Sequence, residues 1–186
     1  GKAGDVDYNG FNDVLAGAPG FSSNRGKVYL YYGGKPMNNT VDVTMTGENA
    51  GDYFGFALSH AGDMNGDFYD DIMIGAYGFS SNRGRVYIYY GSAQPNNTPD
   101  LQMTGAAVNN YFGYAVSSIG DLDANGYSDI AVGAYGYSSN LGRVYIYNGG
   151  VRPDSVSDDR VEGEIANSGF GMCISPGGDF DGLGYN

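Results

Sequence analysis

The sequence predicts an all-β protein built from repeated sheets of four short antiparallel strands. The first observation is composition: the 186 residues include 33 Gly, 18 Tyr and 9 Phe but no Trp. Glycine disfavours helices and aromatic residues are enriched in strands. The second is a constant period, because Gly-Asp recurs at Asp5, Asp63, Asp121 and Asp179, and the differences 63 − 5, 121 − 63 and 179 − 121 are each 58. The third is alternation of apolar and polar residues within each period, which is typical of half-buried strands.

The second repeat shows the expected strands most clearly. We expect a first strand over Tyr53–Ala61 and a fully buried second strand over Asp71–Ala76. A loop over 79–84 leads to a third strand over 85–90, and a weaker outer strand covers 100–104. Four strands of this length make one blade of a β-propeller. We interpret the tyrosines that alternate along the strands as packing between blades.

The repeats set the domain organisation. We divide the chain into repeats over residues 1–49, 50–107 and 108–165, and the start of a fourth over 166–186. The first repeat is expected to lack its own first strand, whereas Asn167–Ser175 supplies a spare one. A propeller closes with about 4 to 8 blades. We therefore expect about three blades of a larger propeller, or of one completed head-to-tail by other copies, with an incoming strand beside residues 13–17.

The charge of the chain is strongly acidic and unevenly distributed. There are 21 acidic and 9 basic residues, giving a net charge of −12. This balance repels phosphates and anionic lipid, so we expect no nucleic-acid partner, and without a long apolar stretch we expect no membrane insertion. Clustered carboxylates repel one another unless a cation is bound, which indicates metal sites. The clustered aspartates are Asp5, Asp7, Asp13, Asp63, Asp67, Asp71, Asp121, Asp123, Asp129, Asp179 and Asp181.

Two of these clusters share one complete pattern. Residues 5–13 and 121–129 both read D-x-D-x-N-G-x-x-D. Oxygen ligands at positions 1, 3, 5 and 9, with a backbone carbonyl at position 7, can surround one hard cation, and Gly at position 6 allows the turn. Oxygen ligands without His or Cys select calcium or magnesium over zinc, and a flexible cage with several carboxylates favours Ca²⁺.

Two alternatives compete with this interpretation. An EF-hand requires Glu at position 12 and flanking helices, but Ala16, Ile74 and Val132 stand there between expected strands. The pattern therefore excludes an EF-hand. Asx-rich turns without a metal are the other alternative. Three aligned loops with three carboxylates each favour the metal sites over such turns.

The second and fourth clusters depart from the pattern. Loop 63–71 keeps its ligand positions, but Phe68 stands at position 6 and Gly66 lies two residues earlier. A bulky residue is strained at positive φ. The fourth cluster has Asp179 and Asp181, but Leu183 stands at its position 5 and the sequence ends before position 9. We therefore expect three complete calcium loops and a possible fourth.

These motifs together resemble a known repeat. Phe54-Gly55, then an acidic loop, then a segment such as Gly17-Ala18-Pro19, closely resembles the FG-GAP repeat of integrin α-subunit β-propellers and their bacterial relatives. The resemblance covers essentially the whole chain. It departs in length, at Tyr77 and Tyr135, which replace Pro, and at Phe68. The family implies seven blades, a calcium loop between the first and second strands of a blade, secretion or surface display, and adhesion or scaffolding.

The resemblance also implies the calcium ligands, residue by residue. They are Asp5, Asp7, Asn9, the carbonyl of Phe11 and Asp13; Asp63, Asn65, Asp67, the carbonyl of Tyr69 and Asp71; and Asp121, Asp123, Asn125, the carbonyl of Tyr127 and Asp129.

The compartment follows in part from the metal. Loop sites of this kind generally need the calcium concentrations found outside cells, so we expect an extracellular or cell-surface location. Asn38-Asn39-Thr40 and Asn96-Asn97-Thr98 are glycosylation sequons at matched positions. They are equally well explained as polar turns.

The expected function is a calcium-binding, non-enzymatic module in adhesion, ligand binding or structural assembly, with a protein or glycan ligand or further blades as partners. The only His, His60, and the only Cys, Cys173, lie far apart in the period, so no nucleophile–base pair stands out. One alternative is the non-catalytic propeller portion of a secreted enzyme of the phospholipase D or lyase type. Another is a carbohydrate-binding module that uses the repeated loops at Phe21, Phe79 and Tyr137.

Overall fold

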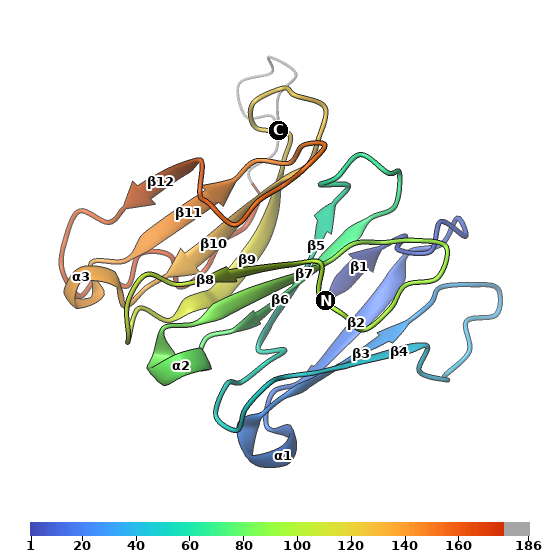
Figure 1. Ribbon diagram of the computed structural model, residues 1–186, viewed down its shortest axis with the longest axis horizontal. Helices are drawn as coiled ribbons and strands as arrows, with labels where there is room; N and C mark the ends of the chain where they lie inside the picture. The colour runs from blue at the N-terminus through green and yellow to red at the C-terminus, as the bar shows by residue number, and fades with distance from the viewer. Residues whose placement is uncertain (177–186) are drawn as a thin grey trace.

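Three four-stranded antiparallel sheets follow one another along the chain in the computed structural model, which describes residues 1–176 (Figure 1). Within each sheet the strands lie side by side in sequence order, so each sheet is one blade. The described residues form three such blades and no closed ring. Within this part of the chain, no helix reaches the length and hydrophobicity of a membrane-spanning helix.

The strands of the three blades occupy matching positions in the period. The first blade contains β1 (Lys2–Gly4), β2 (Asp13–Ala18), β3 (Lys27–Tyr31) and β4 (Val43–Thr46). The second contains β5 (Ala57–Gly62), β6 (Asp71–Ala76), β7 (Arg85–Tyr89) and β8 (Leu101–Thr104). The third contains β9 (Phe112–Gly120), β10 (Asp129–Ala134), β11 (Arg143–Tyr147) and β12 (Asp159–Glu162). The expected second strand Asp71–Ala76 is confirmed with the same bounds.

A four-residue helical turn joins the second and third strands of each blade. These turns are α1 (Phe21–Asn24), α2 (Phe79–Asn82) and α3 (Tyr137–Asn140). In each one, two serines take left-handed dihedral angles; Ser80, for example, has φ 50° and ψ 60°. Because this backbone closes a tight reversal, the third strand returns directly along the second.

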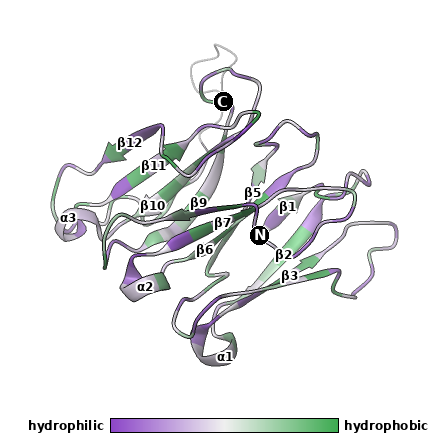
Figure 2. Ribbon diagram, viewed as in Figure 1, coloured by the Kyte–Doolittle hydropathy of each residue, from purple (hydrophilic) through white to green (hydrophobic). Residues whose placement is uncertain are grey.

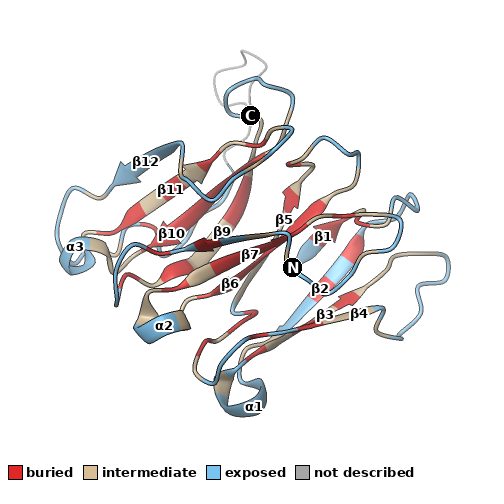
Figure 3. Cartoon of the chain, in the orientation of Figure 1, coloured by how far each residue is buried: buried red, intermediate tan, exposed pale blue. Residues whose placement is uncertain are grey.

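The hydrophobic core lies between the blades. β6 is buried along its whole length, as is β10, and Figure 3 shows both as continuous buried strands. In β6, Ile72 and Ile74 belong to the core shared with the first blade, whereas Met73 belongs to the core shared with the third. Burial on both faces explains why the central strands read as apolar runs, and Figure 2 shows the hydrophobic residues concentrated there.

The Phe-Gly motif links one blade to the next. Phe54 and Phe112 are each 1% exposed, and both form a parallel bridge to a glycine of the preceding blade, Gly26 and Gly84 respectively. A Cβ atom on Gly26 would lie 2.0 Å from the carbonyl oxygen of Phe54. The bridge therefore requires glycine at that position, because no side chain fits between the two backbones.

This linkage corrects the expected first strand of the second blade. We predicted a strand over Tyr53–Ala61, but β5 begins at Ala57. Tyr53 and Gly55 have φ values of 56° and 84°, which turn the chain out of the extended conformation. Phe54 is thereby directed into the bridge with Gly26 rather than into a ladder with β6.

Two further expectations about the ends are wrong. The first repeat does have a first strand, because β1 pairs with β2 through Lys2↔Val14 and Gly4↔Asp13. The Leu15 N–H also donates to the Gly1 carbonyl oxygen at 3.0 Å. That edge is therefore already paired as far as Leu15, where we expected an incoming strand beside residues 13–17. Residues 167–175 form no spare strand among the described residues; Phe170 makes only the bridge to Gly142.

Candidate metal centres

Each acidic loop joins the first strand of a blade to its second. Residues 5–13 connect β1 with β2, residues 63–71 connect β5 with β6, and residues 121–129 connect β9 with β10. This placement is the one that the family resemblance implied. The last aspartate of each loop is also the first residue of a second strand. In the second and third blades the loop therefore closes onto a strand that is buried along its whole length.

The first loop brings three carboxylates together. Oxygens of Asp5, Asp7 and Asp13 all lie within 4.8 Å of one another. Backbone N–H groups turn these oxygens inward: Asn9 donates to Asp5 Oδ1 at 2.9 Å and to Asp7 Oδ1 at 3.2 Å, and Gly10 donates to Asp5 Oδ2 at 2.9 Å. The chain thus wraps around its own carboxylates.

The third loop repeats this arrangement. Oxygens of Asp121, Asp123 and Asp129 lie within 4.8 Å of one another. The Asn125 N–H donates to Asp121 Oδ1 at 3.0 Å and to Asp123 Oδ1 at 3.1 Å. The Tyr127 N–H donates to Asn125 Oδ1 at 2.8 Å, as Phe11 does to Asn9 in the first loop. Identical short patterns therefore fold into the same geometry.

The second loop keeps the backbone frame but not the tight triad. Asp63, Asp67 and Asp71 are not among the carboxylate triads that the described residues bring within that distance. Asn65 occupies position 3, so the third carboxylate of this loop comes from position 5. The Phe68 N–H still donates to Asp63 Oδ2 at 2.9 Å, and Asp67 donates to Asp63 Oδ1 at 3.1 Å.

The strain expected at Phe68 is present. Phe68 has φ 73°, and its side chain is 78% exposed. All three loops have left-handed residues at positions 4 and 6, and the first loop uses Tyr8 and Gly10 there. The second loop has the glycine at position 4, as Gly66, and the bulky residue at position 6. The second loop therefore keeps the backbone conformation of the other two, but its bulky left-handed residue stands at position 6 instead of position 4.

Burial disfavours the charged form of the last aspartate of each loop. Asp13, Asp71 and Asp129 are at most 1% exposed. Burial raises the pKa of all three carboxyls, and that of Asp71 to about 8, although backbone N–H donors partly oppose the shift. At Asp71 these donors are Gly91 and Met64, both at 2.9 Å. A buried carboxylate that faces other carboxylates is stabilised by a nearby cation.

The donor chemistry of the loops fits calcium. The inward-facing groups are carboxylate and amide oxygens, and the described loops contribute neither imidazole nor thiolate. Such an oxygen-only set suits Ca²⁺, whose coordination is flexible. The two tight triads meet this requirement most directly. Asp179 and Asp181, the possible fourth site, lie outside the described residues.

The loops suggested for carbohydrate binding carry basic side chains on their rings. Lys27 Nζ lies 4.2 Å from the centre of the Phe21 ring. Arg85 lies 3.7 Å from the centre of Phe79, and Arg143 lies 3.6 Å from that of Tyr137. Each cation comes from the start of the third strand of the same blade. One face of every ring is therefore already covered by a cation–π contact.

The tyrosines that replace proline have a packing role that sequence reasoning missed. Tyr77 stacks on Tyr53 with ring centres 4.8 Å apart, and Tyr135 stacks on Tyr111 at 4.7 Å. Tyr114 joins the two pairs, because its ring centre lies 5.3 Å from that of Tyr77 and 4.7 Å from that of Tyr135. The matched spacing of 24 residues within each pair was the available signal.

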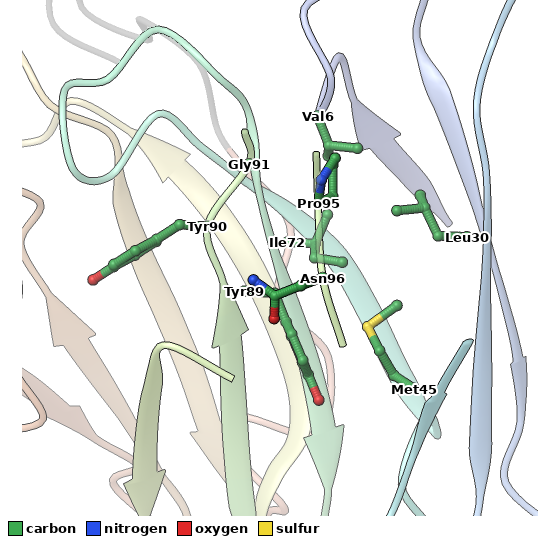
Figure 4. A pocket seen from close by; sticks show the side chains of 9 residues that line it. All are labelled: Val6, Leu30, Met45, Ile72, Tyr89, Tyr90, Gly91, Pro95 and Asn96. Carbon is green, nitrogen blue, oxygen red and sulfur yellow. The ribbon is translucent and has the colours of Figure 1, made fainter. Parts of the chain in front are cut away.

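A small pocket lies where the first two blades meet. Figure 4 shows Val6, Leu30 and Met45 facing the second blade, which contributes Ile72 and Tyr89. Apolar side chains make up most of the lining, which also includes Asn96. The pocket is therefore a packing gap between blades, and Val6 of the first acidic loop lines it.

Comparison with known proteins agrees with this architecture. The model of the family described as "FG-GAP repeat" matches residues 3–31, 54–89 and 112–147, together more than half of the chain. Integrin alpha-8 of Homo sapiens is 36% identical over 157 residues, or 77% of this chain. Integrin alpha-PS2 of Drosophila melanogaster is 37% identical over 150 residues, or 70%. Integrin alpha-5 of Xenopus laevis is 32% identical over 154 residues, or 75%. The chain spans only 11% to 15% of the length of these relatives.

Proposed function

The chain belongs to the FG-GAP repeat family, and from this premise we propose that it is a calcium-binding, integrin α-like propeller segment. We propose that it acts outside the cell or at its surface, in adhesion, ligand binding or structural assembly. The observation that carries the proposal is the pair of carboxylate triads at the same place in the first and third blades. Loop sites in extracellular modules bind calcium at about 10⁻⁴ to 10⁻³ M, which supports that compartment.

The proposed role of calcium is to stabilise the ends of the second strands. Each loop ends on a buried aspartate that both of its backbone donors hold in place, so a cation in the loop would lie at the entrance to the core. Calorimetric titration with calcium chloride tests this directly. We expect two or three sites, and the absence of measurable binding at millimolar calcium would refute the proposal.

The proposed function is not enzymatic. The relatives with printed names are integrin α subunits, and the loop carboxylates are committed to backbone donors and to the proposed cation. His60 lies half-buried in β5, where burial lowers its pKa. These features favour a binding or structural module over the propeller portion of an enzyme.

We further propose that another blade of the same repeat type covers the third blade. Phe170 is 37% exposed and Val161 is 49% exposed, whereas their counterparts Phe112 and Met103 are at most 1% exposed. In the first two blades, the strands of the next blade cover these positions. The same kind of surface, repeated a third time, fits the same kind of partner.

A further inference from the structure

The acidic loops of neighbouring blades touch one another in a repeated way. The ring of Tyr69, at position 7 of the second loop, lies 5.6 Å from that of Tyr8, at position 4 of the first. The ring of Tyr127, at position 7 of the third loop, lies over Gly66, where an added Cβ would be 2.5 Å from Tyr127 Cε1. Position 7 of each loop therefore packs against position 4 of the preceding one.

Backbone hydrogen bonds follow the same direction. The Asp70 N–H donates to the Asp5 carbonyl oxygen at 3.2 Å, and the Ser128 N–H donates to that of Asp63 at 3.0 Å. The residue at position 8 of a loop thus forms a backbone hydrogen bond with the residue at position 1 of the preceding loop. Because position 1 is a proposed ligand, the next blade helps to place it.

The first pair of loops has an additional contact. The Asp5 N–H donates to Asp70 Oδ2 at 2.8 Å, so Asp5 and Asp70 are joined in both directions. The carboxylate of Asp70 also lies against Gly4, where an added Cβ would meet Oδ2 at 2.3 Å. At the matching position of the third loop stands Ser128, which has no carboxylate. Asp70 is absent from our predicted ligands, and its neighbour Asp71 is the last ligand of the second loop.

We propose that Asp70 is a positioning residue that couples calcium binding in the second loop to calcium binding in the first. The inference rests on the proposed calcium function. Calcium in the second loop restrains its proposed ligand Asp71. Because Asp70 is the preceding residue in the chain, the position of Asp70 is restrained as well. Asp70 then fixes Asp5 by its carboxylate and by its N–H. The linkage is reciprocal, so occupancy of the first loop favours filling of the second by the same factor.

The test isolates these two loops. The third loop is disabled throughout by Asp121→Asn with Asp123→Asn, and calcium affinity is measured by calorimetry at constant ionic strength. The affinity of the first loop for calcium is measured in two proteins. In one the second loop is intact, and in the other it is disabled by Asp63→Asn with Asp67→Asn. We expect about a tenfold loss in the first loop, within the range of about 5 to 150 that is typical of coupled sites. In the Asp70→Ser background, the same comparison should change the affinity by less than about twofold.

Two further variants separate the contact from charge and from general stability. Asp70→Asn keeps an acceptor for the Asp5 N–H and should retain most of the coupling, whereas a purely electrostatic effect would be lost as in Asp70→Ser. Asp159→Ser makes the same charge change on the exposed strand β12 and should leave the coupling intact. Hydrogen exchange of the Asp5 amide gives a second readout, which should slow when the second loop fills.

The outcomes distinguish the two proposals. If the protein with all three loops intact binds no calcium, the proposed function fails; if that protein binds calcium but the third-loop-disabled protein does not, the coupling between the first two loops is overturned. If both loops bind but the first has the same affinity whether or not the second is functional, calcium binding stands and the coupling is overturned. Coupling that survives Asp70→Ser overturns the role of Asp70.

Discussion

The hydroxyl of Tyr87 in the second blade donates a hydrogen bond of 2.7 Å to the carboxylate of Glu48, which follows β4 of the first blade. Arg85 adds an ion pair to the same carboxylate at 2.8 Å. Burial and this carboxylate both raise the pKa of Tyr87. Glu48 thus joins the first two blades at their outer edge. The counterpart of Glu48 at the next interface is Ala106, so this contact is specific to the first interface.

Replacing Glu48 should weaken the first interface. Glu48→Ala removes an acceptor shared by Tyr87 and Arg85, and because the carboxylate is 43% exposed we expect a loss of only about 1 kcal/mol in the free energy of unfolding. Glu164 occupies the same position in the third blade and has no hydrogen bond within the described residues. Glu164→Ala is therefore the matched control and should change stability little. Urea denaturation measures both, and equal losses would contradict the role of the contact.

Calcium should raise the melting temperature. At 10 mM calcium, sites with Kd values of about 10⁻⁴ to 10⁻³ M each contribute about 1.4 to 2.7 kcal/mol. The two triads alone should therefore shift the midpoint upward by about 6 to 22 °C for a chain of this size. Differential scanning calorimetry in EDTA, and then after calcium is restored, measures the shift. Magnesium at the same concentration is the control. A melting curve that is unchanged by thorough chelation would contradict the calcium sites.

Much of the fold could be predicted because the same pattern of strands and loops recurs in each repeat. The 58-residue period and the apolar second strand indicated the blades, and Asp71–Ala76 is confirmed with its bounds. The start of β5 was missed because the positive φ values of Tyr53 and Gly55 depend on a bridge to the preceding blade. Backbone conformations that depend on contacts between repeats are hard to predict from the sequence pattern of one repeat.

The candidate site was predictable to a similar degree. The carboxylates of the first and third loops come together as their shared pattern indicated. The contact between Asp5 and Asp70 was not predictable, because it joins residues 65 apart at a position that varies among the three loops. Such a contact depends on how blades pack, which a motif within one loop does not specify.

Relieving the strain in the second loop should stabilise the protein. Phe68→Gly removes a left-handed aromatic residue whose side chain is 78% exposed, so little burial is lost. We expect a gain of about 1 kcal/mol. Phe68→Ala is the control, because alanine also disfavours positive φ and should give no comparable gain. Both are measured by denaturation in EDTA, so that calcium binding does not contribute. A loss of stability for Phe68→Gly would show that the ring makes a stabilising contact.

The glycine in the bridge between blades should be intolerant of any side chain. Gly26→Ala combines an unfavourable φ of 86° with a Cβ placed 2.0 Å from the Phe54 oxygen. Gly51 has φ 85°, but a Cβ there would meet nothing within 4 Å among the described residues. Gly51→Ala should therefore cost about 1 to 2 kcal/mol from backbone strain alone, and Gly26→Ala at least about 3 kcal/mol. Similar costs for the two variants would mean that the close approach is unimportant.

The exposed faces of the end blades should drive association of the isolated chain. Val14 in the first blade and Val161 in the third are 42% and 49% exposed, whereas the counterparts of Val14 in the inner blades, Ile72 and Ile130, are at most 3% exposed. The two end faces correspond to the two sides of an ordinary contact between blades, so one copy can cover the third blade of another with its own first blade. Light scattering in calcium should therefore give a mass above that of the monomer, which falls on dilution. Val161→Asp and Val14→Asp should each lower that mass, because a charge cannot be buried there without a partner. A monomer whose mass does not change with concentration would show that neither face requires a second copy.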